Sequence, residues 1–92
     1  MIARNMDKLE GVGKTTALNV LGEVGGERAE GILAGMISSS VWQHRRAAAE
    51  GLARIGSKVS FELVQERLVE EPHRLVLEAL ERAGRRIEER LE

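Results

Sequence analysis

The 92-residue chain contains no cysteine, one proline and two aromatic residues. The absence of cysteine excludes disulfides and thiolate metal sites, and the scarcity of proline removes the strongest helix breaker. No apolar run approaches the ~20 residues that a membrane-spanning helix requires, and the chain opens with no recognisable signal peptide. We therefore expect a soluble, cytoplasmic protein with an aliphatic core and no membrane partner.

Helix-forming residues dominate the composition of the chain. Apolar residues make up 42% of the chain and charged residues 32%, with a formal net charge of -1, so the composition gives no general attraction to nucleic acid or to an anionic membrane. Abundant Ala, Leu, Glu and Arg favour helices. The pattern predicts one all-α domain over residues 1–92, with helices near 2–9, 14–24, 27–37, 41–55, 58–70 and 73–91. The short connections predict antiparallel neighbours.

Several predicted helix boundaries have a specific chemical basis. Ser40 is followed three residues later by Gln43, which is a capping-box pattern at the start of the helix near 41–55. Gly25 and Gly56 each follow an apolar helix end, where a left-handed residue without a Cβ is favoured. The last helix carries one apolar stripe at helical spacing, made of Val76, Leu80, Ala83, Ile87 and Leu91. We interpret the charges on its opposite face as solvated.

An internal repeat relates three parts of the chain. The segments "LGEVGGERAEGIL" and "LARIGSKVSFELV" align with Gly25 on Gly56, a separation of 31 residues, and Gly84 follows Gly56 after 28 residues. A two-helix unit of about 30 residues is typical of an α-solenoid. The alignment predicts three equivalent contact pairs in one continuous core: Leu21 with Val24, Leu52 with Ile55, and Leu80 with Ala83.

Three segments carry a resemblance to a known family. "WQHRRAAAEGLARIG" and "PHRLVLEALERAG" look like inner helices of short HEAT-like repeats, a type also found in phycobilisome-lyase-like proteins. "GGERAEGIL" looks like the turn and following helix of the same unit. The resemblance covers about residues 14–84. It departs at His44, where the family favours an aliphatic residue, and at Gly51, where it favours alanine.

This resemblance implies a short α-solenoid of antiparallel helix pairs, with a partial repeat at about residues 1–25 and repeats at about 26–56 and 57–92. It also implies a non-catalytic protein-interaction or scaffolding module. Both ends of a solenoid expose apolar edges unless they are capped. We therefore expect a protein partner, or self-association into a homo-oligomer, through the exposed solenoid ends.

The segment "GVGKTT" at residues 11–16 has three interpretations. It looks like the end of a nucleotide-binding loop, but Lys8 stands where that motif needs its first glycine, and no aliphatic strand precedes it. "LEGVGKTTALNVL" resembles the helix-hairpin-helix motif, which implies a nucleic-acid site with Gly11 and Gly13 in the hairpin and Lys14 on a phosphate. In the interpretation we favour, it is the turn and inner helix of the first repeat. Nucleic-acid binding is the alternative function.

The candidate partner-binding residues lie on the later inner helices. Trp and Arg are the commonest anchors of protein interfaces, and Trp42, Arg45, Arg46 and Arg74 predict a basic ridge suited to an acidic peptide or a phosphate backbone. Two alternatives stay open at this point. The ring of Trp42 packs between adjacent repeats, or the arginines are neutralised by the many glutamates of the chain itself.

No catalytic or metal-binding set is recognisable. His44 and His73 are the only histidines, and neither has carboxylates at ligand spacing on its own helix, so we interpret both as surface residues at helix starts. The serines at 38–40 have no evident base beside them. The sequence therefore predicts no enzyme activity, no metal and no cofactor.

Overall fold

The computed structural model describes residues 12–92, and all the regular structure in that part is helical. The predicted helix near 2–9 lies outside the described residues. The helices are α2 (Val12–Val24), α3 (Glu27–Met36), α4 (Trp42–Ile55), α5 (Lys58–Glu70) and α6 (Arg74–Leu91). The predicted helices near 14–24, 27–37, 41–55, 58–70 and 73–91 are confirmed to within two residues at each end.

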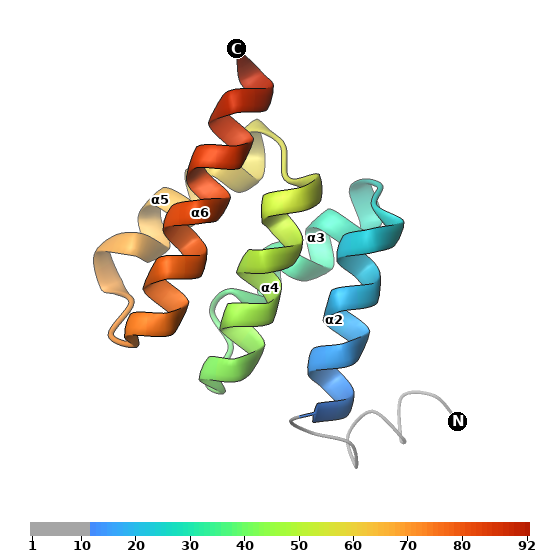
Figure 1. Ribbon diagram of the computed structural model, residues 1–92, viewed down its shortest axis with the longest axis vertical. Helices are drawn as coiled ribbons and strands as arrows, with labels where there is room; N and C mark the ends of the chain where they lie inside the picture. The colour runs from blue at the N-terminus through green and yellow to red at the C-terminus, as the bar shows by residue number, and fades with distance from the viewer. Residues whose placement is uncertain (1–11) are drawn as a thin grey trace.

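The helices form two layers (Figure 1). Helices α2, α4 and α6 lie side by side and run in the same direction, and α3 and α5 return behind them in the opposite direction. Helix α4 packs against α2 on one side and α6 on the other, with α3 behind it. The predicted all-α solenoid of antiparallel helix pairs is therefore confirmed.

The core runs between the two layers and is aliphatic throughout. Helix α4 contributes a run of three alanines at 47–49, all fully buried, because small side chains allow neighbouring helices to approach closely from several sides. Leu52 of α4 itself and larger side chains from the rest of the chain fill the space around them: Leu18, Leu33, Ile37, Val64, Val76 and Leu80.

The predicted contact pairs are only partly correct. Leu52, Leu80 and Ala83 are fully buried, and Leu21 and Ile55 pack against the same cluster. Val24, by contrast, is 74% exposed at the last turn of α2. The prediction for Val24 is wrong. Among residues 12–92, α2 has a packed neighbour in its own layer only on the α4 side, and Leu18 instead supplies the buried side chain from this helix.

Two of the predicted helix boundaries differ from the structure. Helix α4 is preceded by Val41 as its N-cap residue with no side-chain cap, so the capping box of Ser40 and Gln43 is not formed. Instead the Ser39 hydroxyl accepts a hydrogen bond from the Val41 amide at 3.1 Å. Gly25 has the predicted left-handed conformation, with φ of 77°.

Gly56 does not have the predicted left-handed conformation, because its φ is -63°. Its requirement for glycine is steric. A Cβ at this position would lie 2.6 Å from the carbonyl oxygen of Leu52 and 2.6 Å from Cδ1 of Ile87. Gly56 therefore permits the close passage of α6 across the end of α4.

Candidate interaction surface on the α2, α4 and α6 layer

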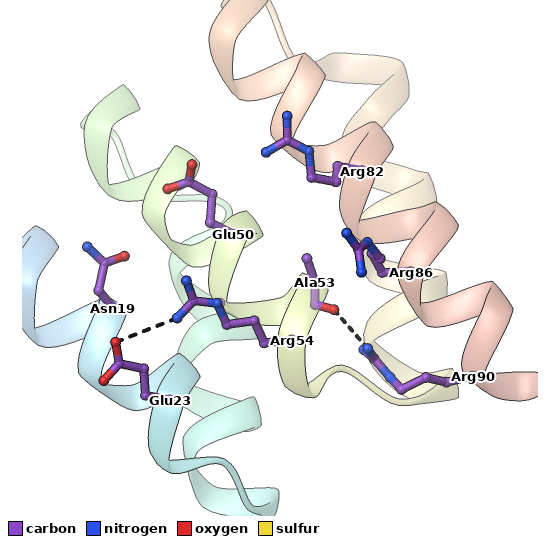
Figure 2. A pocket seen from close by; sticks show the side chains of 9 residues that line it. Asn19, Glu23, Glu50, Ala53, Arg54, Arg82, Arg86 and Arg90 are labelled. Atoms are coloured by element: carbon purple, nitrogen blue, oxygen red, sulfur yellow. Dashed lines mark hydrogen bonds and ion pairs between the residues drawn. The ribbon is translucent and has the colours of Figure 1, made fainter.

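The α2, α4 and α6 layer is hollowed on the side away from α3 and α5 (Figure 2). The hollow has a volume of about 650 Å³, and we call it the basic groove. It is lined by Asn19 and Glu23 of α2, by Glu50, Gly51, Ala53 and Arg54 of α4, and by Arg82, Arg86 and Arg90 of α6. Four of the nine described residues that line it are arginines and two are glutamates, so positive charge dominates this lining.

Helical spacing places these side chains in rows. Residues four apart on a helix lie on the same face, about one turn from each other. On α4 one row runs through Trp42, Arg46, Glu50 and Arg54, and on α6 a second row runs through Arg74, Glu78, Arg82, Arg86 and Arg90. The two rows hold six arginines and two glutamates. The groove lies where the C-terminal parts of the two rows face each other (Figure 2).

Two of the groove's arginines have partners within the protein. Arg54 approaches Glu23 of α2 at 3.7 Å, and both side chains are more than half exposed, so this ion pair contributes little. Arg90 donates to the last carbonyl groups of α4, to Ala53 at 2.8 Å and to Gly56 at 3.0 Å. The guanidinium of Arg90 therefore caps the C-terminus of α4, where cations are favoured.

Arg82 and Arg86 differ from these two. Both are exposed, and neither makes a hydrogen bond or ion pair with any residue that the structure describes. Their side chains project from α6 toward the groove (Figure 2). They are thus two solvated guanidinium groups, one helical turn apart, in a concave surface.

Arg45, one of the predicted partner-binding residues, is buried and forms its contacts inside the protein. Its Nε donates to Glu71 at 2.8 Å and its Nη2 to the second oxygen of the same carboxylate at 3.0 Å. Its Nη1 donates to the carbonyl of Ser39 at 2.8 Å. The Arg45 side chain is 11% exposed and that of Glu71 is fully buried, so this guanidinium is committed to the interior and is not presented to a partner.

The Glu71 carboxylate is held in its charged form by these contacts. Burial raises the pKa of Glu71, but hydrogen bonds from Arg45, from the His73 amide and from Arg67 outweigh that effect and leave the pKa below its ordinary value of 4.5. The His73 amide donates at 2.9 Å. A charged Glu71 therefore ties the start of α6 to α4.

The other predicted partner-binding residues occupy the N-terminal ends of the two rows. The ring of Trp42 stacks on that of His73, with centroids 3.9 Å apart and planes inclined by 14°, and it stays half-buried. Arg46 pairs with Glu50 at 3.7 Å, and Arg74 with Glu78 at 3.8 Å. Both pairs are substantially exposed and therefore weak.

The two histidines have different environments. His44 is 2% exposed, so its interpretation as a surface residue is wrong. His44 lies on the buried face of α4. It occupies the position where the resemblance to HEAT-like repeats leads one to expect an aliphatic residue. His73 is the N-cap residue of α6, and its Nδ1 accepts from the Leu75 amide at 3.2 Å.

The alternative nucleic-acid site falls mostly outside the described residues. Gly11 lies outside them, and only the backbone of Lys14 is described. Helix α2 already begins at Val12, so Gly13 belongs to its first turn.

The sequence interpretation missed Arg82, Arg86 and Arg90. Their four-residue spacing was a visible signal, but the same spacing is typical of any solvated helix face. No group of three or more metal-binding side chains lies together among residues 12–92, and no described helix is long and apolar enough to cross a membrane.

Comparison with known families supports the repeat architecture. The family model for HEAT repeats matches residues 7–84. Comparisons with curated protein sequences and with solved structures gave no significant match. The narrower resemblances, to phycobilisome-lyase-type repeats and to helix-hairpin-helix, stay predictions.

Proposed function

The chain belongs to the HEAT-repeat family, and we propose that it is a non-catalytic protein-binding module whose basic groove holds an acidic segment of a protein partner. HEAT repeats expose extended concave surfaces that their partners occupy. The groove crosses the three helices of the α2, α4 and α6 layer. The occupant is a peptide segment rich in glutamate or aspartate.

One observation carries this proposal. Arg82 and Arg86 are unpaired cations among the described residues, although glutamates are abundant in this chain. A guanidinium presents a planar fork of donors that matches a carboxylate in a bidentate contact. Two such forks one turn apart suit two carboxylates of one segment. Arg54 adds a third cation across the groove, and its pairing with Glu23 at 3.7 Å is weak enough to be exchanged.

The charge pattern favours an acidic peptide over a nucleic acid. Glu23 and Glu50 also line the groove, and they would repel a continuous phosphate backbone. Among the described residues, no aromatic side chain lines the groove to stack on a base. An acidic peptide, whose charges are separated by neutral residues, avoids both problems.

Trp42 and Arg46 extend the same surface along α4. Trp42 is half-buried against His73, so its ring is already immobilised and costs little entropy when a partner covers its open edge. Arg46 lies one turn further along the row, and Arg74 begins the row on α6. These residues form the rim of the binding surface, and Arg82 and Arg86 form its centre.

The test is a titration of a fluorescein-labelled peptide of alternating glutamate and alanine, followed by anisotropy. We expect the wild-type protein to bind with an affinity that falls as salt rises. The variant Arg82→Glu/Arg86→Glu is expected to lose at least about tenfold in affinity, equal to ~1.4 kcal/mol. The matched control is Arg28→Glu/Arg85→Glu, which makes the same change in charge at two exposed arginines outside the groove.

Equal binding by the wild type and the groove variant would contradict the proposal. Binding of a labelled DNA duplex that is stronger than peptide binding, and that is lost in Lys14→Glu, would instead favour the alternative site at Gly11, Gly13 and Lys14.

A further inference from the structure

Helix α5 carries an acidic row on the layer opposite the groove. Glu62, Glu66 and Glu70 are all exposed and lie four residues apart, and we call them the acidic stripe. Glu70 approaches Arg67 at 3.8 Å with a side chain that is 75% exposed. Glu62 and Glu66 make no ion pair with any residue in the described part of the chain.

Large apolar side chains flank the acidic stripe on the same helix. Val59 is 68% exposed, Leu63 is 37% exposed and Val69 is 88% exposed. Helix α5 therefore presents three exposed apolar side chains beside two carboxylates, Glu62 and Glu66, that have no ion-pair partner among the described residues. Burial of apolar area is the term that gives an interface most of its affinity.

We propose that the basic groove of one copy receives the acidic stripe of α5 from a second copy of this chain. The inference rests on the proposed function, because it takes the groove to be a site for acidic segments. It goes further by naming the segment. The partner's carboxylates at 62 and 66 pair with the guanidinium groups of Arg82 and Arg86.

The spacing of the two rows matches. A helix rises 1.5 Å per residue, so both Glu62 to Glu66 and Arg82 to Arg86 advance by about 6 Å along their helices. Two carboxylates of α5 thus meet two guanidinium groups of α6 without a change in either helix. The flanking Val59 and Leu63 then lie against the rim of the groove and lose contact with water.

The placement of the two surfaces determines the kind of assembly. The groove belongs to the α2, α4 and α6 layer, and the acidic stripe belongs to α5 in the other layer (Figure 1). Each copy therefore carries the basic groove on one side and the acidic stripe on the opposite side. Such a heterologous contact does not form a two-fold dimer. It adds copies one after another, into a ring if the rotation closes and into an open filament if it does not.

The experiment is sedimentation equilibrium of the full chain at low salt over a rising concentration series. We expect a mass that rises past that of a dimer and that falls back when salt is added. The groove variant Arg82→Glu/Arg86→Glu and the stripe variant Glu62→Arg/Glu66→Arg are each expected to be monomeric over the same range. A mixture of the two is expected to associate again, because the intact stripe meets the intact groove and the charge-reversed stripe meets the charge-reversed groove.

The control variant is Glu88→Arg/Glu92→Arg, which makes the same charge change as the stripe variant at exposed carboxylates near the end of α6. It is expected to associate like the wild type. Circular dichroism checks that each variant keeps its helices. If charge reversal disturbs folding, the neutral variant Glu62→Gln/Glu66→Gln replaces the stripe variant. Its dissociation constant for self-association is expected to be at least about tenfold higher than that of the wild type.

The outcomes distinguish the two proposals. A wild type that stays monomeric at every concentration, while the acidic peptide still binds, overturns the self-contact and leaves the proposed function standing. A wild type that neither associates nor binds the peptide overturns both. Association that is equal in the wild type and in both charge-reversed variants also overturns the self-contact.

Discussion

At the scale of single residues, the buried ion pair between Arg45 and Glu71 joins three parts of the fold. Both oxygens of a fully buried carboxylate receive donors from one guanidinium, at 2.8 and 3.0 Å. Arg67 adds a further donor to Glu71 at 3.3 Å. The remaining nitrogen of the Arg45 guanidinium, Nη1, donates to the Ser39 carbonyl. One pair thereby connects α4, the end of α5 and the loop before α4.

We expect Arg45→Ala to be strongly destabilising, because it leaves the Glu71 carboxylate buried with most of its compensating charge removed. Breaking a buried pair from one side costs about 3–5 kcal/mol. Urea unfolding followed by circular dichroism measures the loss. The control is Arg46→Ala, at a neighbouring arginine whose pair with Glu50 is exposed, where a change below about 1 kcal/mol is expected. Equal losses in the two variants would contradict this account.

Glu30 provides a second carboxylate whose charge supports the fold. From α3 it accepts from the Ser57 amide and hydroxyl, each at 2.7 Å, and from the Ser60 hydroxyl. It thus caps the start of α5 from another helix. Burial raises the pKa of Glu30, but the hydrogen bonds from Ser60 and Ser57, and the nearby charge of Arg90, outweigh it and lower the pKa below 4.5.

The lowered pKa values of Glu30 and Glu71 predict acid sensitivity. A group whose pKa is lower in the folded state binds fewer protons there than in the unfolded state, so its stabilising effect is complete above 4.5, the unfolded-state value. It is lost as the pH falls through the folded-state pKa. We expect the free energy of unfolding to decrease between about pH 5 and pH 3.

Urea titrations across that range check the prediction. The variant Glu71→Gln is expected to be less stable at neutral pH and to lose less stability on acidification. A free energy of unfolding that stays constant, or rises, over the same range would show that these carboxylates are not held in their charged form.

At the scale of helices, the contact between α2 and α4 depends on two facing glycines. A Cβ on Gly22 would lie 2.8 Å from the Cα of Gly51, and a Cβ on Gly51 would lie 2.8 Å from Cδ1 of Leu33. The backbones of the two helices therefore approach with no side chain between them. At Gly51 itself, the space that a Cβ would need is filled by the Leu33 side chain of α3, and α2 lies at an ordinary contact distance of 3.5 Å.

We expect Gly22→Ala to destabilise the protein by about 1–3 kcal/mol, because α2 and α4 must separate to admit the methyl group. The matched control is Gly31→Ala in α3, where a Cβ meets no atom within 4 Å and helix propensity favours alanine by about 1 kcal/mol. Opposite signs are therefore predicted for the same substitution in two helices. Thermal unfolding of both variants measures them, and a stabilising Gly22→Ala would refute the close contact.

At the scale of the whole molecule, α4 is the central helix of the part that the structure describes. It packs against α2, α3 and α6, whereas α3 and α5 touch each other only slightly. In a repeat protein, stability is a sum of units and of the interfaces between neighbours. A helix that shares interfaces on three sides opens only when several of those interfaces are lost.

Native-state hydrogen exchange is expected to follow this arrangement. Amides in the buried alanine run of α4 and around Leu52 should exchange most slowly, and those of α3 and α5 should exchange faster, because fewer contacts must open to expose them. Mass spectrometry of peptides spanning each helix measures the order. Protection in α5 equal to that in α4 would contradict a structure organised around α4.

The sequence by itself determined the five helices of residues 12–92, their approximate ends and the repeat. These depend on local chemistry, namely apolar side chains at helical spacing and glycines at the breaks, and both are visible in a single chain. It also placed Leu52 and Leu80 in the core, because each lies on the apolar face of its own helix. The failure at Val24 shows the limit of this reasoning, because periodicity does not reveal whether a neighbour covers that face.

Only the tertiary structure decided which arginines are buried in ion pairs and which are exposed to solvent. Arg45 and Arg46 are adjacent and chemically identical, but successive helical residues point about 100° apart, so one enters the core and the other meets solvent. The partner of Arg45 is Glu71, 26 residues away, and no local pattern connects them. The basic groove exists only because packing sets the rows of α4 and α6 beside each other.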